Sequence, residues 1–461
     1  MGQDHKDASM QIPALLVACL SNALIPFLGA SVNIALPSIG KEYGANALIL
    51  GWIQTAFLLA AAVCSVPFGR IADIYGMKRV FSYGTLLITV ALFFGAYAPS
   101  AYWLIFFRVL QGIGGGMIFV TSLAIVTSVF PLQARGKAIG IVIATTYASL
   151  SIAPALGGTM THYLGWRSVF WGQILIAVSI LLIVYWKLHG EWAASKGESF
   201  DLKGAVFYSV ALILFMYGFS RLPGPQGVVP FLLGIAVMTG FVRFESRTET
   251  PLLNVRLFQN KTFALSTLAA LINYGAVFMT AFMMSFYLQY IKGLDPQAAG
   301  MILITQPIGM AIFAPIAGRL SDRINPLKLA SLGMALSAAG LFSFTFLAAD
   351  TPVYQIVVGL IVIGVGFGIF SSPNTNAIMG SVERRFYGVA SAAVSTMRLL
   401  GQMLSMGLVL MVFAILIGSA RITPANYPAL QDSIVTVFAI GTALCVTGVF
   451  VALAGGKRQI P

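Results

Sequence analysis

Two arginines stand inside long apolar runs of the sequence, where an uncompensated charge is costly. Arg108 lies in the run 102–130, and Arg398 lies in the run 387–417. A guanidinium at the centre of a membrane helix costs roughly 2.5 to 3.5 kcal/mol on insertion scales, so each should face a wet cavity or a polar partner. Arg398 would lie about 16 Å from the start of its helix, too deep to reach the membrane surface easily. It could bind an anionic or zwitterionic group of a substrate, or it could donate to helix carbonyls.

Polar side chains within the other apolar runs are further candidates for contact with a substrate. Arg108 allows the same two interpretations as Arg398, since its neighbours could satisfy it without a ligand. We expect the substrate-binding residues to be Arg398, Arg108, Asn22, Asn33, Gln111, Asn273, Tyr274, Gln289 and Gln306. Aromatic residues and the 18 methionines could hold an apolar tail, because methionine adapts to irregular apolar shapes.

No acidic residue accompanies these arginines in the middle of an apolar run. The 14 aspartates and glutamates all fall in the expected loops or at the ends of the runs. A buried carboxylate can exchange a proton for a cationic substrate, and this sequence has none at mid-membrane. Two buried cations without a buried anion predict a cavity of positive potential.

Several classes of function are excluded by motifs that the sequence lacks. The three cysteines form no CxxC pair and have no neighbouring histidine, so we expect no metal site. No P-loop of the form GxxxxGKS or GxxxxGKT occurs, and the runs contain no cluster of carboxylates or histidines for catalysis. The net charge of +13 is scattered through short loops, unlike the clustered charge of nucleic-acid-binding proteins. We therefore expect no enzymatic activity, no cofactor and no nucleic-acid partner.

Long apolar helices are the elements that must position these residues. Of the 461 residues, 58% are hydrophobic and 9% are charged, whereas soluble domains have about 25% charged residues, so most of the chain must be surrounded by lipid. Uninterrupted runs without a two-residue alternation indicate helices rather than a barrel. We expect fourteen spans, at 12–36, 48–69, 79–98, 102–130, 137–160, 167–188, 203–221, 227–245, 262–291, 298–320, 327–349, 354–379, 387–417 and 433–455.

The distribution of basic residues predicts the orientation of the spans. With the N-terminus inside, twenty of the 27 lysines and arginines fall in inner loops or at inner ends of spans. Five fall on the outside, namely Lys41, Arg167, Arg221, Lys292 and Arg421. Because cytoplasmic loops carry the excess of Lys and Arg, we expect a multi-pass protein of the plasma membrane with both termini in the cytoplasm.

The sequence also contains an internal repeat. Gly-Arg-Ile-Ala-Asp at 69–73 recurs as Gly-Arg-Leu-Ser-Asp at 318–322, and three glycines in 112–116 match three in 364–368. Spans one to six and nine to fourteen are therefore two copies, with spans seven and eight between them. Such halves are typical of transporters that alternate access to a site between them, although packing alone could also preserve a duplication. We expect a six-helix bundle at 1–190, two inserted helices at 191–258 and a second six-helix bundle at 259–461.

Three motifs resemble those of one transporter family. The loop 69–79 reads GRIADIYGMKR, the stretch 108–116 reads RVLQGIGGG, and the stretch 149–158 reads SLSIAPALGG. The chain resembles the major facilitator superfamily in these motifs, and the last one is similar to the antiporter element of its 14-span drug:proton antiporter branch. The resemblance covers almost the whole length and implies an all-α fold of two pseudo-symmetric bundles.

This resemblance implies roles for particular residues. In that family, the acid and the bases of the first signature hold the two halves together on the cytoplasmic side, since a carboxylate facing a helix N-terminus or a cation is favoured in one conformation. The implied conformational switch consists of Gly69, Arg70, Asp73, Gly76, Lys78, Arg79, Arg319 and Asp322. The implied positions for helix packing and kinking are Pro154, Gly157 and Gly158, where small residues permit close approach.

One position departs from the pattern of the branch. Its members usually have Leu-Asp-x-Thr before Val-Asn-x-Ala-Leu-Pro in span one, and here Leu28 stands where the aspartate is expected. The simplest proton-coupling mechanism of the branch therefore lacks its acid in this chain.

Together these observations predict a secondary transporter with no catalytic residues. The leading hypothesis is an exporter of amphiphilic, multidrug-like compounds that works by alternating access. The alternative is an exporter or uniporter of an organic anion or lipid-like metabolite, without proton coupling through a carboxylate. The expected partners are a small-molecule substrate, the lipid bilayer, and protons or another coupling ion, and we expect the chain to act as a monomer.

Overall fold

The computed structural model describes residues 2–193, 195–248, 252, 255–383 and 387–455. These residues contain fourteen helical spans that are long and apolar enough to cross a membrane, as predicted, and they contain no strand. Four of the predicted inner cations, Arg384, Arg385, Lys457 and Arg458, lie outside the described residues.

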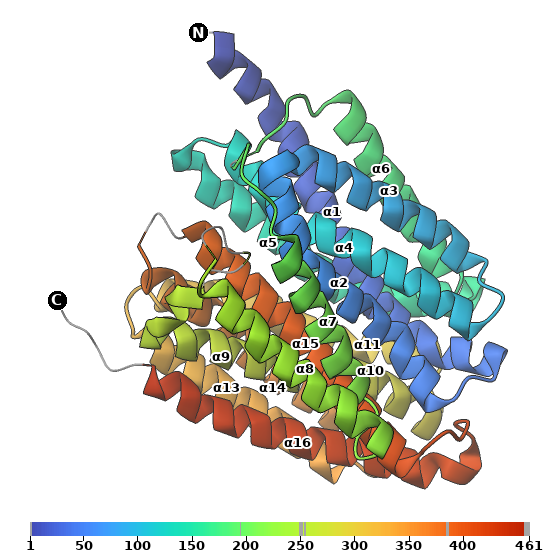
Figure 1. Cartoon of the computed structure of the whole chain (residues 1–461). Coiled ribbons are helices and arrows are strands. Elements are labelled where there is room, and N and C mark those ends of the chain that lie inside the picture. Colours follow the sequence, from blue (N-terminus) through green and yellow to red (C-terminus); the bar gives the residue numbers. More distant parts are fainter. Residues whose placement is uncertain (1, 194, 249–251, 253–254, 384–386, 456–461) are drawn as a thin grey trace.

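The first six spans form one bundle, which Figure 1 shows in blue to green. Its helices are α1 (Gly2–Tyr43), α2 (Ala47–Tyr75), α3 (Met77–Ala96), α4 (Ala101–Val129), α5 (Leu132–Leu164) and α6 (Ser168–Trp186). Spans seven and eight form a hairpin of α7 (Leu202–Phe219) and α8 (Pro225–Glu245). The Tyr208 hydroxyl on α7 donates to Ala62 O on α2 at 3.1 Å, so the hairpin packs against the first bundle.

The last six spans form the second bundle, in which spans nine and ten are each interrupted. Span nine comprises α9 (Lys261–Val277), α10 (Met279–Phe286) and a π-helical turn, η2 (Tyr287–Ile291). Span ten comprises α11 (Pro296–Leu303) and α12 (Thr305–Leu320). The remaining helices are α13 (Pro326–Ser343), α14 (Val353–Gly380), α15 (Tyr387–Leu416) and α16 (Tyr427–Ala454), with short 3-10 turns η1 (Val255–Gln259), η3 (Phe344–Phe346) and η5 (Pro424–Asn426).

Polar caps begin several of these helices. The side chain of Asn46 accepts from Ile49 N at 2.9 Å, and that of Asp295 accepts from Ala298 N at 2.9 Å, which satisfies backbone donors that a helix start leaves free. The fourteenth span begins earlier than predicted, because α16 already starts at Tyr427. Asp432 is exposed within its first two turns.

The glycines of the internal repeat pack in the same way in both bundles. A Cβ at Gly112 on α4 would meet the carbonyl of Phe57 on α2, and a Cβ at Gly364 on α14 would meet the carbonyl of Gln306 on α12. Small residues permit such close helix contacts in membranes. The repeated sequence pattern therefore corresponds to a repeated packing of helices, as expected for two pseudo-symmetric bundles.

Both ends of the described chain lie on one face of the molecule (Figure 1), since fourteen spans separate them. We call this the termini face and the opposite one the far face.

Candidate functional site

Arg398 lies on α15 between the two bundles and is half-buried. Its guanidinium carbon is 5.3 Å from the ring centroid of Phe119 on α4 and 6.0 Å from that of Tyr274 on α9. Rings from both bundles thus lie within reach of cation–π attraction. The Nε atom of Arg398 is buried without a hydrogen-bond partner among the described residues. The structure therefore brings Arg398 and Tyr274 together at the junction of the halves.

No acidic residue pairs with Arg398 in the part of the chain that the structure describes. Close contacts between basic and acidic side chains there include Arg70–Glu198, Arg79–Glu191, His162–Asp295 and Arg167–Glu42. The acidic residues with described positions all lie in loops or within about two turns of a helix end. The charge of Arg398 consequently gives its surroundings a positive potential that favours an anionic group.

The side chains of Tyr147 and Asn22, also near the middle of their helices, differ in whether they contact the other bundle. The Tyr147 hydroxyl on α5 lies 3.3 Å from the Ser371 hydroxyl on α14, a link between the bundles. Asn22 donates to Ser122 Oγ at 3.0 Å, which keeps its amide within the first bundle. Sequence reasoning missed Phe119, because a phenylalanine in a span usually faces lipid or packs, and nothing in the sequence marks this one.

Arg108 is fully buried inside the first bundle. Its Nε donates to Ile53 O at 3.0 Å and its Nη2 to Gln54 Oε1 at 2.9 Å. Gln111 accepts from Arg108 Nη1 at 3.2 Å and donates to Ala91 O at 3.1 Å. All these partners belong to α2, α3 and α4, so the geometry favours a structural arginine. We therefore leave Arg108 and Gln111 out of the proposed substrate site.

Asn273 and Gln306 are buried within the second bundle. Asn273 is next to Tyr274 on α9 but has no exposed surface, and neither atom of its amide has a hydrogen-bond partner among the described residues. Gln306 is 7% exposed, and its backbone carbonyl lies against Gly364 of α14. Neither side chain is therefore available to a substrate between the bundles in this conformation.

Asn33 and Gln289 lie where the bundles meet toward the far face. Ser285 Oγ on α10 donates to Asn33 O on α1 at 2.7 Å, and Gln289 Nε2 donates to Ile34 O at 3.0 Å. The Asn33 carbonyl is free to accept because Pro37 has no N–H to donate to it. In this conformation the two residues join the bundles rather than line an open space.

Backbone contacts between α5 and α11 close the same face. A Cβ at Gly158 would meet the carbonyl of Pro296, and a Cβ at Gly300 would meet the carbonyl of Pro154. Gly157 instead packs within the first bundle, against α1. Helices approach this closely only where a side chain is absent or small, so Gly158 contributes directly to the contact between the halves.

The two faces of the molecule differ in how firmly the bundles are joined. The side-chain hydrogen bonds and the ion pair described between them lie at mid-depth or toward the far face. At the other end of α5, Gly136 and Gly140 have nothing within 4 Å of an added Cβ. The conformation is therefore closed at the far face and looser at the termini face.

The first signature loop, at the termini face, is held by the segment that precedes α7. Glu191 accepts from Lys78 N at 2.7 Å and lies 3.5 Å from Arg79 Nε. Arg70 forms an ion pair with Glu198. The loop thus contacts the connection between the first bundle and the hairpin.

The other implied switch residues show no contact across the halves among the described residues. Gly76 has a φ of 121°, and the Glu191 carboxylate lies where a Cβ would be, so only glycine fits. Asp73 is half-buried, whereas Arg319 and Asp322 are exposed. The lock that the resemblance implies is not formed in this conformation, and its role remains a proposal.

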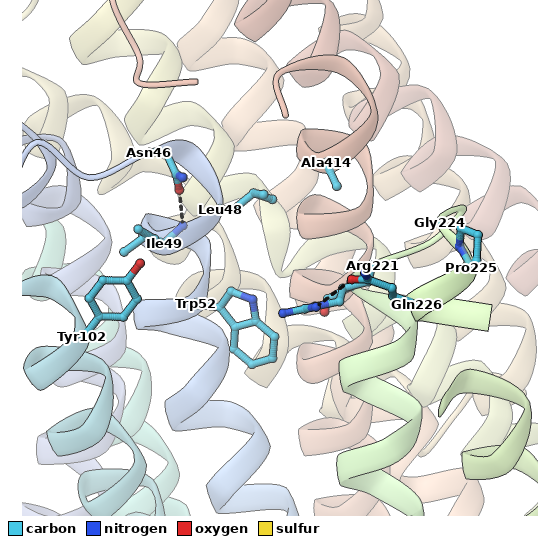
Figure 2. A pocket seen from close by; sticks show the side chains of 11 residues that line it. Asn46, Leu48, Ile49, Trp52, Tyr102, Arg221, Gly224, Pro225, Gln226 and Ala414 are labelled. Carbon is cyan, nitrogen blue, oxygen red and sulfur yellow. Dashed lines mark hydrogen bonds between the residues drawn. The ribbon is translucent and has the colours of Figure 1, made fainter. Parts of the chain in front are cut away.

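A groove of about 610 Å³ opens at the far face beside the hairpin (Figure 2). Its walls come from the starts of α2 and α4, the end of α15, and the turn between α7 and α8. It is lined by Asn46, Leu48, Ile49, Trp52, Tyr102, Ser220, Arg221, Gly224, Pro225, Gln226 and Ala414. This groove was not predicted from the sequence, and Arg398 does not line it.

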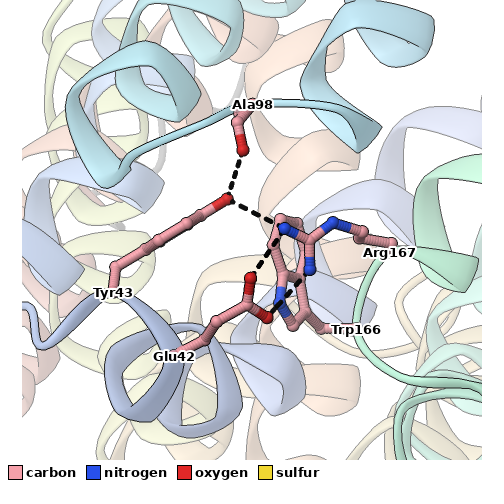
Figure 3. A network of polar contacts seen from close by, with 5 residues as sticks. All are labelled: Glu42, Tyr43, Ala98, Trp166 and Arg167. Atoms are coloured by element: carbon pink, nitrogen blue, oxygen red, sulfur yellow. Dashed lines mark hydrogen bonds and ion pairs between the residues drawn. The ribbon is translucent and has the colours of Figure 1, made fainter.

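A polar network braces the far-face end of the first bundle (Figure 3). Glu42 at the end of α1 accepts two hydrogen bonds from Arg167, at 2.6 and 2.8 Å, and one from Trp166 Nε1 at 2.7 Å. The Tyr43 hydroxyl donates to Ala98 O at 2.6 Å. These bonds tie α1 to the turns before α4 and α6, so this end should move as one body.

Two six-helix bundles that meet around an arginine without an acidic partner in the described part of the chain, closed at one face and looser at the other, are the architecture of a secondary transporter that alternates access. The chain belongs to the Major Facilitator Superfamily, whose sequence model matches residues 18–406 and 266–456.

Named relatives support the same class. The Riboflavin transporter RibZ of Clostridioides difficile (strain 630) is 27% identical over 387 residues, which cover 83% of this chain and 84% of that protein. The Multidrug resistance protein B homolog of Mycobacterium tuberculosis (strain ATCC 25618 / H37Rv) is 30% identical over 383 residues, which cover 80% of this chain and 70% of that one. These relatives confirm the predicted likeness to the multidrug-efflux-like branch, and they are transporters rather than enzymes.

Solved structures confirm the fold. A peptide transporter in complex with alafosfalin superimposes with a TM-score of 0.73 at 14% identity, covering 99% of both chains. A bacterial homologue of the human lysosomal transporter Spinster, in an inward-facing conformation, gives a TM-score of 0.67 at 17% identity, covering 97% of both chains.

Proposed function

We propose that this transporter exports amphiphilic compounds with an anionic or zwitterionic head group, which Arg398 binds between the two bundles. The observation that carries the proposal is the half-buried guanidinium of Arg398, which faces Phe119 and Tyr274 and has no acidic partner among the described residues. The aromatic rings would contact the apolar part of the substrate, while the guanidinium supplies a charge-assisted hydrogen bond to its head.

The orientation of the chain completes this proposal. The excess of basic residues in alternate loops supports an orientation with the termini face in the cytoplasm, and the membrane would be the plasma membrane. The conformation closed at the far face is then the one that takes up substrate from inside the cell. Proteins named for multidrug resistance among the relatives are consistent with export.

A flux assay with purified protein in liposomes tests the role of Arg398. Riboflavin, for which one relative is named, and a panel of amphiphilic anions and cations are the substrates to compare. Losing a hydrogen bond from a charged group costs about 1.5 to 3 kcal/mol, so Arg398→Ala should raise KM for anionic substrates about tenfold or more. Arg398→Lys should retain part of the activity, and Arg323→Ala, at the termini face, should match the wild type. Equal KM values for Arg398→Ala and the wild type would contradict the assignment.

A second candidate is transport of an organic anion without proton coupling. The specific observation in its favour is Leu28, fully buried in α1 where the branch usually has an acid, together with the peripheral positions of the described acidic residues. A carboxylate-based proton site at mid-membrane would need an acidic residue there, with its pKa shifted by burial.

An imposed pH gradient separates the two candidates. Proteoliposomes loaded with substrate are assayed with a gradient across the membrane and again after an ionophore collapses it, at constant membrane potential. We expect flux to change less than twofold between these conditions if no carboxylate couples protons. Uphill accumulation that follows the gradient would instead show a proton antiporter, and the coupling residue would then lie at a position other than 28.

A further inference from the structure

The far-face groove beside the hairpin is not used by the transport mechanism proposed above. We propose that it binds an anionic phospholipid from the adjacent membrane leaflet, with the phosphate at Arg221 and an acyl chain against Trp52. This inference is independent of the proposed function, since Arg398 does not line the groove.

The groove lies at the depth of the lipid head groups. Tyr102 and Trp103, at the start of α4, are 71% and 52% exposed, and exposed Trp and Tyr mark the interface between the membrane and water. Arg221 follows the end of α7 by two residues. A lipid in the adjacent leaflet can therefore reach the groove sideways with its head group at the level of Arg221.

The charged residue that lines the groove is basic, which favours binding of an anionic head group. None of its eleven lining residues is acidic, and Arg221 extends across the groove toward Trp52 (Figure 2). Gln226 accepts from Arg221 Nη1 at 3.4 Å, and the guanidinium carbon lies 4.5 Å from the ring centroid of Tyr217. Both contacts are with uncharged groups, and no ion pair of Arg221 occurs among the described residues. Arg421 is a further cation of the far face, and its backbone forms a bridge with that of Asn46, which lines the groove. The positive charge of Arg221 at this opening attracts a phosphate.

One part of the groove wall is apolar, which favours a lipid over a soluble phosphate. Leu48, Ile49, Trp52 and Ala414 line it. Leu48 and Trp52 pack against a buried cluster that includes Met216 of the hairpin, so this wall is fixed in position. A volume of about 610 Å³ is typical of a small-molecule site and suits a head group with the first part of an acyl chain.

The position of the groove gives such a lipid a structural consequence. Its walls come from the first bundle, the second bundle and the hairpin at once, and the hairpin already packs against both α2 and α15 through one buried cluster. A lipid bound there would connect all three parts at the far face and stabilise the closed arrangement.

Binding of short-chain phosphatidylglycerol to the purified full-length chain tests this proposal. Native mass spectrometry would compare it with phosphatidylcholine of the same chain length, in the same detergent. One basic residue near a lipid surface contributes enough binding energy that its loss weakens affinity about fivefold. We expect Arg221→Gln to weaken phosphatidylglycerol binding by about that factor and to leave phosphatidylcholine binding unchanged. Lys41→Gln, another far-face cation that does not line the groove, should behave as the wild type.

A second variant and a competitor make the test decisive. Ala414→Phe fills the groove from the opposite wall without changing any charge, and it should reduce binding of both lipids. Glycerol 3-phosphate at millimolar concentration should not displace the bound lipid. Equal affinity of the wild type for the two lipids, unchanged phosphatidylglycerol binding in Arg221→Gln, or displacement by glycerol 3-phosphate would each overturn the proposal.

Discussion

The two arginines within the spans show how neighbours decide the role of one residue type. Arg108 donates to a carbonyl and two side-chain amides inside one bundle. Arg398 stands between two bundles, and ring faces rather than acceptors surround its guanidinium. A buried charge with full hydrogen bonding stabilises packing, whereas one left open can bind a ligand.

Replacing Arg108 with methionine should therefore destabilise the protein rather than change its substrates. The variant leaves Gln54 Oε1 and Gln111 Oε1 without their donor, and a buried unpaired acceptor costs about 1 to 3 kcal/mol. Thermal unfolding of the purified protein, followed by tryptophan fluorescence, should show a lower midpoint. Arg398→Met should lower the midpoint less and the flux more. A stable Arg108→Met protein with altered substrate preference would contradict this division of roles.

Among the helices, the contact between α5 and α11 is the clearest determinant of the closed far face. Gly158 and Gly300 each face a carbonyl of the other helix, in a reciprocal arrangement. Small residues at such positions let helices approach without a side chain between them.

A bulky residue at this contact should hold the far face open. In Gly158→Leu, the new side chain would overlap the carbonyl of Pro296, so α5 and α11 must separate. Spin labels at Lys41→Cys and Lys292→Cys, one in each bundle, report this as a longer distance by electron paramagnetic resonance. The background should lack the three native cysteines.

Gly136→Leu is the matched control for that experiment. It lies on the same helix, and an added Cβ there meets nothing within 4 Å. Its label distance should equal that of the parent protein. If Gly158→Leu gave the same distance distribution as Gly136→Leu, the glycine contact would not determine closure of the far face.

For the molecule as a whole, the orientation in the membrane can be tested directly. We expect a cysteine at Lys292, on the far face, to react with a membrane-impermeant maleimide in intact cells. A cysteine at Arg323, on the termini face, should react only after the cells are permeabilised. Labelling of the second site and not the first in intact cells would reverse the proposed orientation, and with it the assignment of export.

Much of the architecture follows from the amino-acid sequence alone. The length of an apolar run is a local property that sets whether a helix can cross a bilayer, and so all fourteen spans were predicted. The repeated glycines likewise indicated two bundles, because small residues mark close helix contacts wherever they recur. The motifs also identified the superfamily, whose sequence model matches most of the chain.

The candidate site depended on contacts that no local pattern encodes. Arg108 and Arg398 are both arginines within apolar runs with the same two interpretations, and only the packing of helices shows that one is enclosed and the other faces Phe119 and Tyr274. Asn33 and Gln289 were likewise predicted to bind substrate, and the structure places them in hydrogen bonds that join α1 of the first bundle to span nine of the second. How the bundles pack determines the direction in which a side chain points and which distant helix it meets. This long-range arrangement decides whether a polar residue in a span joins the two bundles, stabilises one bundle or is available to bind a substrate.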